Sequence, residues 1–122
     1  MKALILDVMG VLVDENSLLD YPEFVKICDE LKAKGEFIVL FSNSSSQVVL
    51  HEPLQSFAKK YEVDGYFSDS GGPIKPTMES FKALLGLHNL KPEECLYIDD
   101  GMHNIEIADK LGFKTIYYIS PQ

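Results

Sequence analysis

The sequence predicts an α/β domain in which a central parallel sheet lies between two layers of helices. Short apolar runs alternate with segments in which apolar residues recur every three or four positions, the pattern of buried strands and amphipathic helices. The alternation continues along all 122 residues without a linker or a change of composition. We therefore expect residues 1–122 to form a single domain.

The first half of the chain supplies two of the predicted strands. Residues 3–6 are four consecutive apolar residues, which suits a strand buried on both faces of a parallel sheet. A helix is expected next, because Asp20 and Glu23 have the spacing of a capping box and apolar residues follow at helical spacing. Residues 37–41 form a continuous apolar run and predict the second strand.

The second half repeats this alternation. Three further strands are expected, at residues 63–67, 95–98 and 115–119. Helices fill the intervals: one in the second half of residues 48–61, one capped by Thr77, and one that ends at Gly112. Right-handed crossovers between parallel strands place helices on both faces of the sheet, which gives a three-layer, Rossmann-like architecture.

Composition and charge exclude several kinds of partner. The formal net charge is −8, and all 11 basic residues are lysine, whereas nucleic-acid surfaces rely on clustered arginine and lysine. No apolar run approaches the roughly 20 residues that cross a bilayer. Asp7 interrupts the first apolar run too early for a signal peptide. We expect a cytoplasmic protein that binds neither nucleic acid nor a membrane.

Polar residues follow three of the predicted strands. They are Asp7 after the first, Ser42 and Asn43 after the second, and Asp99 and Asp100 after the fourth. Lys75 enters from a loop before a helix, and parallel topology brings all of them to one edge of the sheet. Carboxylates without a thiolate or imidazole cluster favour Mg²⁺, while hydroxyl, amide and ammonium groups suit phosphoryl oxygens. One carboxylate is left to attack phosphorus; alternatively, Asp7 only caps a turn.

In this order the motifs resemble those of the haloacid dehalogenase superfamily, most of whose members are phosphatases. The first motif, a strand ending in Asp-x-Asp-Gly-[Thr/Val], appears at residues 7–11 as Asp-Val-Met-Gly-Val. Ser-Asn at 42–43 matches the second motif and Lys-Pro at 75–76 the third. Residues 99–104, Asp-Asp-Gly-Met-His-Asn, match the fourth. The resemblance covers nearly the whole chain.

This resemblance implies a role for each site residue. Asp7 would be the nucleophile and, with the carbonyl of Met9, a ligand of Mg²⁺. Asp100 and the adjacent acid Asp99 would complete the metal site, and Asp100 most resembles the carboxylate that binds the ion directly, although either of the two could be the direct ligand. The remaining implied roles are catalysis and phosphate binding by Ser42 and Lys75, phosphate binding by Asn43, and orientation of Lys75 or the metal-bound waters by Asn104.

Met9 departs from the family pattern, because phosphatases of this family carry there an aspartate that protonates the leaving alcohol and activates water. General acid–base catalysis is typically worth 10² to 10⁴ in rate. Three readings stay open. The chain could be a slow phosphatase that acts on good leaving groups or borrows protons from water or His103. It could cleave a carbon–halogen or carbon–phosphorus bond, as relatives without an acid at this position do, although the absence of arginine and tryptophan disfavours a dehalogenase. Or it could be a degenerate site that binds metal and phosphate without turnover.

The chain also leaves no room for the cap domain that related enzymes insert after the first motif. Only one helix and its short lead-in fit between Asp14 and Phe37, so the site is expected to be open. This implies either a large phosphorylated substrate or a lid supplied by a second copy or a partner subunit. The net charge disfavours an anionic polymer as the substrate.

Overall fold

A five-stranded parallel sheet forms the centre of the molecule in the computed structural model, which describes residues 1–119. The strand order is β3-β2-β1-β4-β5. The strands are β1 (Ala3–Leu6), β2 (Phe37–Phe41), β3 (Asp64–Tyr66), β4 (Cys95–Asp99) and β5 (Lys114–Tyr117). The order reverses direction at β1, which is the switch point at which open parallel sheets bind ligands.

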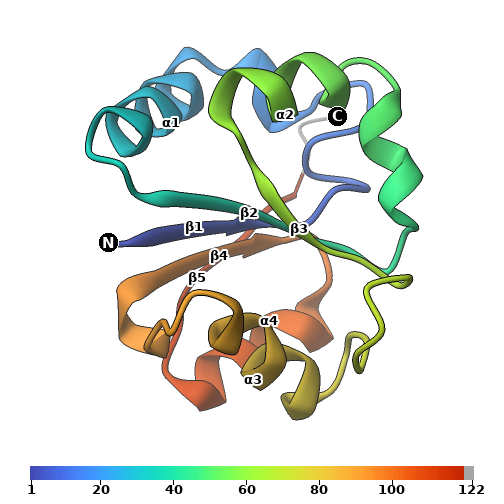
Figure 1. Ribbon diagram of the computed structural model, residues 1–122, viewed down its shortest axis with the longest axis vertical. Coiled ribbons are helices and arrows are strands. Elements are labelled where there is room, and N and C mark those ends of the chain that lie inside the picture. The colour runs from blue at the N-terminus through green and yellow to red at the C-terminus, as the bar shows by residue number, and fades with distance from the viewer. Residues whose placement is uncertain (120–122) are drawn as a thin grey trace.

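Helices cover both faces of this sheet (Figure 1). They are α1 (Pro22–Ala33), α2 (Leu54–Tyr61), α3 (Met78–Leu87) and α4 (Met102–Leu111). In Figure 1, α1 and α2 lie on one side of the sheet and α3 and α4 on the other. Three short 3-10 turns complete the connections: η1 (Leu18–Asp20), η2 (Ser46–Leu50) and η3 (Pro92–Glu94). The predicted three-layer α/β architecture is confirmed.

The central strand β1 is shared by two hydrophobic cores. Leu4 and Leu6 belong to the core beneath α1 and α2, whereas Ala3 and Ile5 belong to the core beneath α3 and α4. All four side chains are fully buried. Successive strand residues point to opposite faces, so an uninterrupted apolar run is what a strand covered on both faces requires. Burial on both sides fixes the position of Asp7, the next residue.

Two of the predicted helix boundaries can be compared with the structure. The capping box of Asp20 and Glu23 is wrong: Asp20 lies in η1, and α1 begins at Pro22 after Tyr21, whose side chain makes no capping hydrogen bond. Proline is well suited to the first helical position without such a cap. The cap at Thr77 is confirmed, because its hydroxyl accepts a hydrogen bond of 3.2 Å from the Ser80 backbone N–H.

No cap domain stands over the sheet in the described part of the chain. Between β1 and β2 there are only η1 and α1, and α1 packs on the sheet through Phe24, Cys28 and Leu31. The carboxyl edge of the sheet is therefore left uncovered by any inserted domain. Among residues 1–119, no helix has the length and apolar character to span a membrane.

Candidate active site

The residues predicted from the strand ends meet at one pocket at the carboxyl edge of the sheet. The pocket has a volume of about 350 Å³. Its lining includes every predicted site residue: Asp7, Met9, Ser42, Asn43, Lys75, Asp99, Asp100 and Asn104. These side chains come from the ends of β1, β2 and β4, from the start of α4, and from the loop between β3 and α3. The parallel topology has collected them as expected.

Lys75 is the buried cation of this pocket. Only 5% of the residue is exposed. Its Nζ lies 3.0 Å from Oδ1 of Asp7 and 3.1 Å from Oδ2 of Asp99. The same nitrogen lies 5.0 Å from the centre of the Phe41 ring, a cation–π distance. A buried ammonium needs such pairing to remain charged, so Lys75 joins the two carboxylates into one unit.

Asn43 holds the backbone of Lys75 in place. Its Nδ2 donates to the carbonyl oxygen of Lys75 at 3.0 Å, and its Oδ1 accepts from the backbone N–H of Lys75 at 3.1 Å. Both polar atoms of the amide are thus used to position the lysine. A direct contact between Asn43 and phosphate stays a prediction.

Ser42 lies at the turn after β2 with its hydroxyl at the pocket. The residue is 4% exposed. Its backbone N–H donates to the carbonyl oxygen of Tyr66 at 3.0 Å, and its Oγ accepts from the backbone N–H of Ser44 at 3.1 Å. Since the oxygen is used as an acceptor, the hydroxyl proton remains available as a donor to an anion. Ser44 also lines the pocket and was missed from the sequence.

Asp99 is held as an anion by several donors. Its Oδ2 accepts from Lys75, from the Tyr97 hydroxyl, and from Nδ2 of Asn104 at 3.2 Å. Its Oδ1 accepts from the backbone N–H of Gly101 at 2.9 Å. Burial opposes ionisation, but the charge of Lys75 and these hydrogen bonds outweigh it and lower the pKa of Asp99. The site therefore contains one carboxylate that stays ionised.

Tyr97 is a site residue that the motifs did not reveal. Its side chain is fully buried, and its hydroxyl donates to Asp99 and accepts from Nζ of Lys75 at 3.4 Å. Burial, followed by the negative charge of Asp99, raises the pKa of Tyr97, so the phenol remains protonated. A signal was present in the sequence: residues two apart on a strand share a face, so Tyr97 had to point the same way as Asp99.

Asp7 and Asp100 bring further carboxylates to the same place. Burial, reinforced by the charge of Asp99 and opposed by Lys75, raises the pKa of Asp7 to about 7. Burial and the proximity of Asp99 also raise the pKa of Asp100. Oxygen atoms of Asp7, Asp99 and Asp100 lie within 4.8 Å of one another. Like charges this close repel each other, and a divalent cation would relieve that repulsion.

A second feature of the pocket fits a hydrated cation. Oδ1 of Asn104 is buried and accepts no hydrogen bond from any residue that the structure describes, although its Nδ2 is used on Asp99. Buried acceptors normally have a donor, often a water molecule. The carboxylate groups nearby offer oxygen atoms as metal ligands, which Mg²⁺ prefers. Mg²⁺ also keeps several of its water molecules when it binds to a protein. The residues present therefore fit this ion.

Met9 brings an apolar side chain to a pocket otherwise lined by polar groups. The residue is 53% exposed and lines the pocket. A thioether is only a weak hydrogen-bond acceptor and carries no proton to transfer. His103, the other group considered as a proton carrier, is exposed and is not among the pocket-lining residues.

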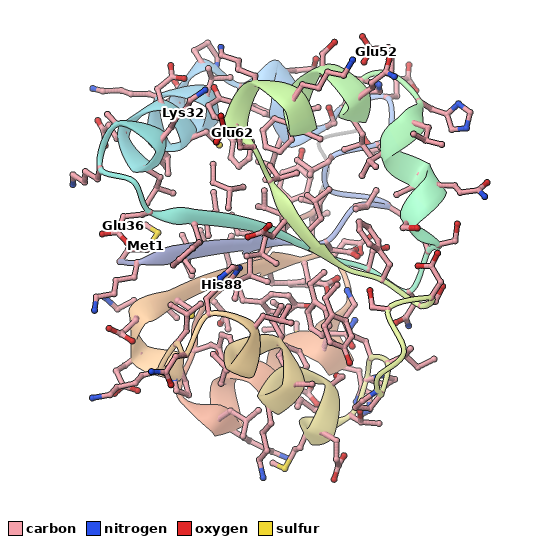
Figure 2. All side chains as sticks on the ribbon, in the orientation of Figure 1. Met1, Lys32, Glu36, Glu52, Glu62 and His88 are labelled. Carbon is pink, nitrogen blue, oxygen red and sulfur yellow. The ribbon has the colours of Figure 1, made fainter. Side chains whose placement is uncertain are left out.

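A second hollow lies at the opposite, amino-terminal edge of the sheet. It measures about 240 Å³ and is bordered by Lys32, Glu36 and Glu62, which are labelled in Figure 2. Beside it, Nε2 of His88 lies 2.7 Å from Oδ2 of Asp64. Because ligands of open parallel sheets bind at the carboxyl ends of the strands, the functional site is assigned to the first pocket.

Several known proteins are similar to this chain in sequence or in fold. D-ribitol-5-phosphate phosphatase from Bacteroides thetaiotaomicron is 36% identical over 64 residues, an alignment that covers 52% of this chain and 29% of that enzyme. The chain thus matches less than a third of the length of this curated relative. A crystal structure from Corynebacterium glutamicum aligns with a TM-score of 0.76 and 25% identity, over 97% of this chain and 85% of that one.

A haloacid-dehalogenase-family enzyme of B. thetaiotaomicron, solved as an aspartate-to-alanine variant with magnesium and inorganic phosphate, has the same fold. Its TM-score is 0.66 at 24% identity, over 84% of this chain and 53% of that one. The sequence profile of the haloacid dehalogenase-like hydrolases matches residues 1–112. Together with the pocket described above, this match shows that the chain belongs to the haloacid dehalogenase-like hydrolase family.

Proposed function

We propose that this chain is a Mg²⁺-dependent phosphatase that forms an aspartyl-phosphate on Asp7. The observation that supports this most strongly is the pairing of the Asp7 carboxylate with Lys75 at 3.0 Å, inside a pocket of about 350 Å³ that no inserted domain covers within residues 1–119. A carboxylate fixed in this way is pre-oriented for attack on an electrophile that enters the pocket.

The neighbouring groups suit a phosphoryl substrate. Lys75 and the hydroxyl proton of Ser42 would neutralise the non-bridging oxygens, whose negative charge must be stabilised during transfer. Asn43 would keep Lys75 in position through its two hydrogen bonds to the lysine backbone. Asp99 would keep the ammonium group of Lys75 aimed at the reacting centre, because Nζ of Lys75 lies 3.1 Å from its carboxylate.

The same pocket would hold the metal ion. Asp7, Asp100 and the backbone carbonyl of Met9 are the proposed ligands, and Asn104 would accept a hydrogen bond from a metal-bound water through its unpaired Oδ1. When bound, Mg²⁺ supplies positive charge that attracts the phosphate and neutralises the acidic cluster. Asp99 is better placed to orient Lys75 than to bind the ion, because both of its oxygens already accept hydrogen bonds.

The open pocket also affects which substrates and protein partners can reach the site. Without a cap domain, a phosphorylated group on a large molecule could approach the carboxyl edge directly. A second copy of the chain or a partner subunit that supplies a lid is the other arrangement compatible with an open edge. The substrate itself is proposed only as a phosphorylated compound, since the named activity of the curated relative belongs to a much longer protein.

A second function is favoured by Met9. Because this side chain cannot exchange protons, the pocket could bind metal and phosphate without completing a catalytic cycle. Such a protein would act as a binding module rather than as a phosphatase. The phosphatase and the binding module differ in whether a phosphoryl group is transferred to Asp7.

Hydrolysis of 4-nitrophenyl phosphate, with and without Mg²⁺, tests the proposal. Nitrophenolate leaves without a proton, so the absence of an acid at Met9 should not prevent this reaction. We expect turnover that requires Mg²⁺ and is abolished in Asp7→Asn, an uncharged substitution of nearly the same shape. Mg²⁺ binding measured by calorimetry without any turnover would contradict the phosphatase and favour the binding module.

A further inference from the structure

We infer that this site is selective for phosphoryl compounds whose leaving group departs as a stable anion, namely acyl phosphates and activated aryl phosphates, and that the phosphorylated form of Asp7 accumulates. This inference rests on the proposed function. It goes beyond it by naming the chemical class of substrate and the state in which the protein would be found during turnover.

The argument begins with the groups that could give a proton to a leaving oxygen. Among the described residues, no imidazole or thiol lines the pocket. At its mouth stands Met9, half exposed and without a transferable proton. The hydroxyl and amide side chains of the lining are far too weakly acidic to donate a proton near neutral pH. The position from which an acid would act is therefore filled by a thioether.

Lys75 does not replace the missing acid. Its ammonium lies within 3.1 Å of two carboxylates, on Asp7 and Asp99, and only 5% of the residue is exposed. Giving up a proton would leave two buried negative charges without their counter-ion, which is strongly unfavourable. The carboxylates do not replace it either, because Asp7 and Asp99 are paired with Lys75 and Asp7 and Asp100 are the proposed ligands of the cation.

The first step is fast only if the leaving group needs no proton. An oxygen of the Asp7 carboxylate attacks phosphorus and forms a new P–O bond, while the bond from phosphorus to the leaving oxygen breaks. The leaving oxygen keeps the electron pair and departs as a carboxylate or phenolate. An alkyl phosphate would have to release an alkoxide, which is far more basic, so this class is expected to react slowly.

The second step, hydrolysis of the aspartyl-phosphate, is also affected by the missing proton-transfer group at Met9. Water must attack the phosphorus of the aspartyl-phosphate while the bond from phosphorus to the Asp7 oxygen breaks and the proton of the water passes to bulk solvent. The products are inorganic phosphate and the free Asp7 carboxylate. The side chain of Met9 cannot accept the proton of the attacking water. Release of phosphate is then slower than formation of the intermediate whenever the leaving group is good, so phosphorylated Asp7 builds up.

The test compares substrates that differ in leaving group. Acetyl phosphate, a series of substituted phenyl phosphates and D-ribitol-5-phosphate would be given to the full chain with Mg²⁺. Rates would be measured for the unaltered chain, for Met9→Asp, and for Met9→Asn, which matches aspartate in size but cannot transfer a proton. Phosphorylation of Asp7 would be measured separately by mass spectrometry of acid-quenched protein, with Asp7→Asn as its control.

We expect the rates of the unaltered chain to rise steeply with the acidity of the leaving group, and acetyl phosphate to leave a near-stoichiometric phosphoryl group on Asp7. Met9→Asp should accelerate D-ribitol-5-phosphate hydrolysis by about 10² or more, which is the usual worth of a general acid and base. Met9→Asp should also reduce the steady-state fraction of Asp7 that is phosphorylated. Met9→Asn should keep the steep dependence on the leaving group.

Three results would overturn the inference. The first is hydrolysis of D-ribitol-5-phosphate by the unaltered chain at the rate of 4-nitrophenyl phosphate. The second is an equal acceleration of all substrates by Met9→Asp, and the third is turnover without detectable phosphorylated Asp7. If no substrate, including acetyl phosphate, phosphorylates Asp7 in any variant, the proposed function itself fails together with the inference.

Discussion

A Cβ atom on Gly10 would lie 1.9 Å from Oδ2 of Asp100. The close approach occurs at the turn after β1, where Gly10 has a φ of +81°. Glycine is thus required at this position for two reasons. It permits the left-handed backbone conformation, and it leaves room for the Asp100 carboxylate. The turn that contains Gly10 therefore packs directly against the carboxylate of Asp100.

Gly10→Ala should therefore weaken metal binding in addition to destabilising the fold. The methyl group would push the Asp100 carboxylate out of the acidic cluster, and we expect Mg²⁺ affinity, measured by calorimetry, to fall by about tenfold or more, equivalent to at least about 1.4 kcal/mol. Phosphatase activity at limiting Mg²⁺ should fall with it.

Gly35→Ala is the matched control for this change. Gly35 also has a positive φ, +70°, but an added Cβ would meet no atom within 4 Å. Both variants should lose roughly 1–2 kcal/mol of unfolding free energy from backbone strain. Equal Mg²⁺ affinity in the two variants would show that the approach of Gly10 to Asp100 does not matter for the ion.

Replacing Lys75 should destabilise the metal-free protein. Lys75→Met leaves Asp7 and Asp99 buried without their shared counter-ion, and breaking a buried pair in this way costs about 3–5 kcal/mol. The loss, measured by urea unfolding in EDTA, should be smaller near pH 6 than near pH 8, because Asp7 can take up a proton at the lower pH.

Lys2→Met provides the comparison at the surface. The Lys2 ammonium lies 2.9 Å from Glu94, but its side chain is 61% exposed, and exposed ion pairs contribute little to stability. We expect no measurable change in unfolding. A Lys75→Met variant as stable as Lys2→Met would mean that the lysine does not neutralise the two buried acids.

The stability of the metal-free protein should fall as pH rises through the titration of Asp7. The pKa of this carboxyl is about 7 in the folded chain and about 3.9 in an unfolded one. Between these values the folded state holds a proton that the unfolded state has lost, so raising the pH favours unfolding.

The loss should begin above about pH 4 and be complete above about pH 7, with a size of roughly 2–4 kcal/mol. Thermal melts in EDTA between pH 5 and pH 8 measure it. Asp7→Asn should flatten the profile, and saturating Mg²⁺ should restore stability at the high end. A profile for Asp7→Asn as steep as that of the unaltered chain would assign the titration to another group.

The two cysteines should resist modification in the folded protein. Burial raises the pKa of the Cys28 thiol to about 12 and that of Cys95 to about 11, and neither forms a disulfide. Thiolate is the reactive form, so iodoacetamide near pH 8 should label both only in denaturant. Rapid labelling of either thiol under native conditions would contradict this packing.

The helix-covered parallel sheet and the meeting of the site residues were predictable because both follow from simple rules. An uninterrupted apolar run such as residues 3–6 requires cover on both faces, and parallel crossovers bring the strand ends together. These two rules are sufficient to place Asp7 and Asp99 in one pocket, although they lie far apart in the sequence.

Contacts between side chains were less predictable. The spacing of Asp20 and Glu23 suggested a capping box, but Asp20 is taken up by η1 and Pro22 begins the helix. Asn43 turned out to bind the backbone of Lys75, and Tyr97 was overlooked because no motif contains it. The contact of Asn43 depends on which group a distant segment brings near, which local spacing does not specify. The turn at Asp20 and the shared face of Tyr97 and Asp99 are local features that lie outside the motifs.

The most direct test of the central proposal is a crystal structure of the protein soaked with Mg²⁺ and fluoroberyllate, which mimics a phosphoryl group. We expect beryllium to be bonded to a carboxylate oxygen of Asp7, with fluorides near Lys75 and Ser42 and the cation beside Asp100. Fluoroberyllate bound elsewhere, or a pocket that takes up Mg²⁺ but leaves the Asp7 carboxylate unbonded, would contradict nucleophilic catalysis by this residue.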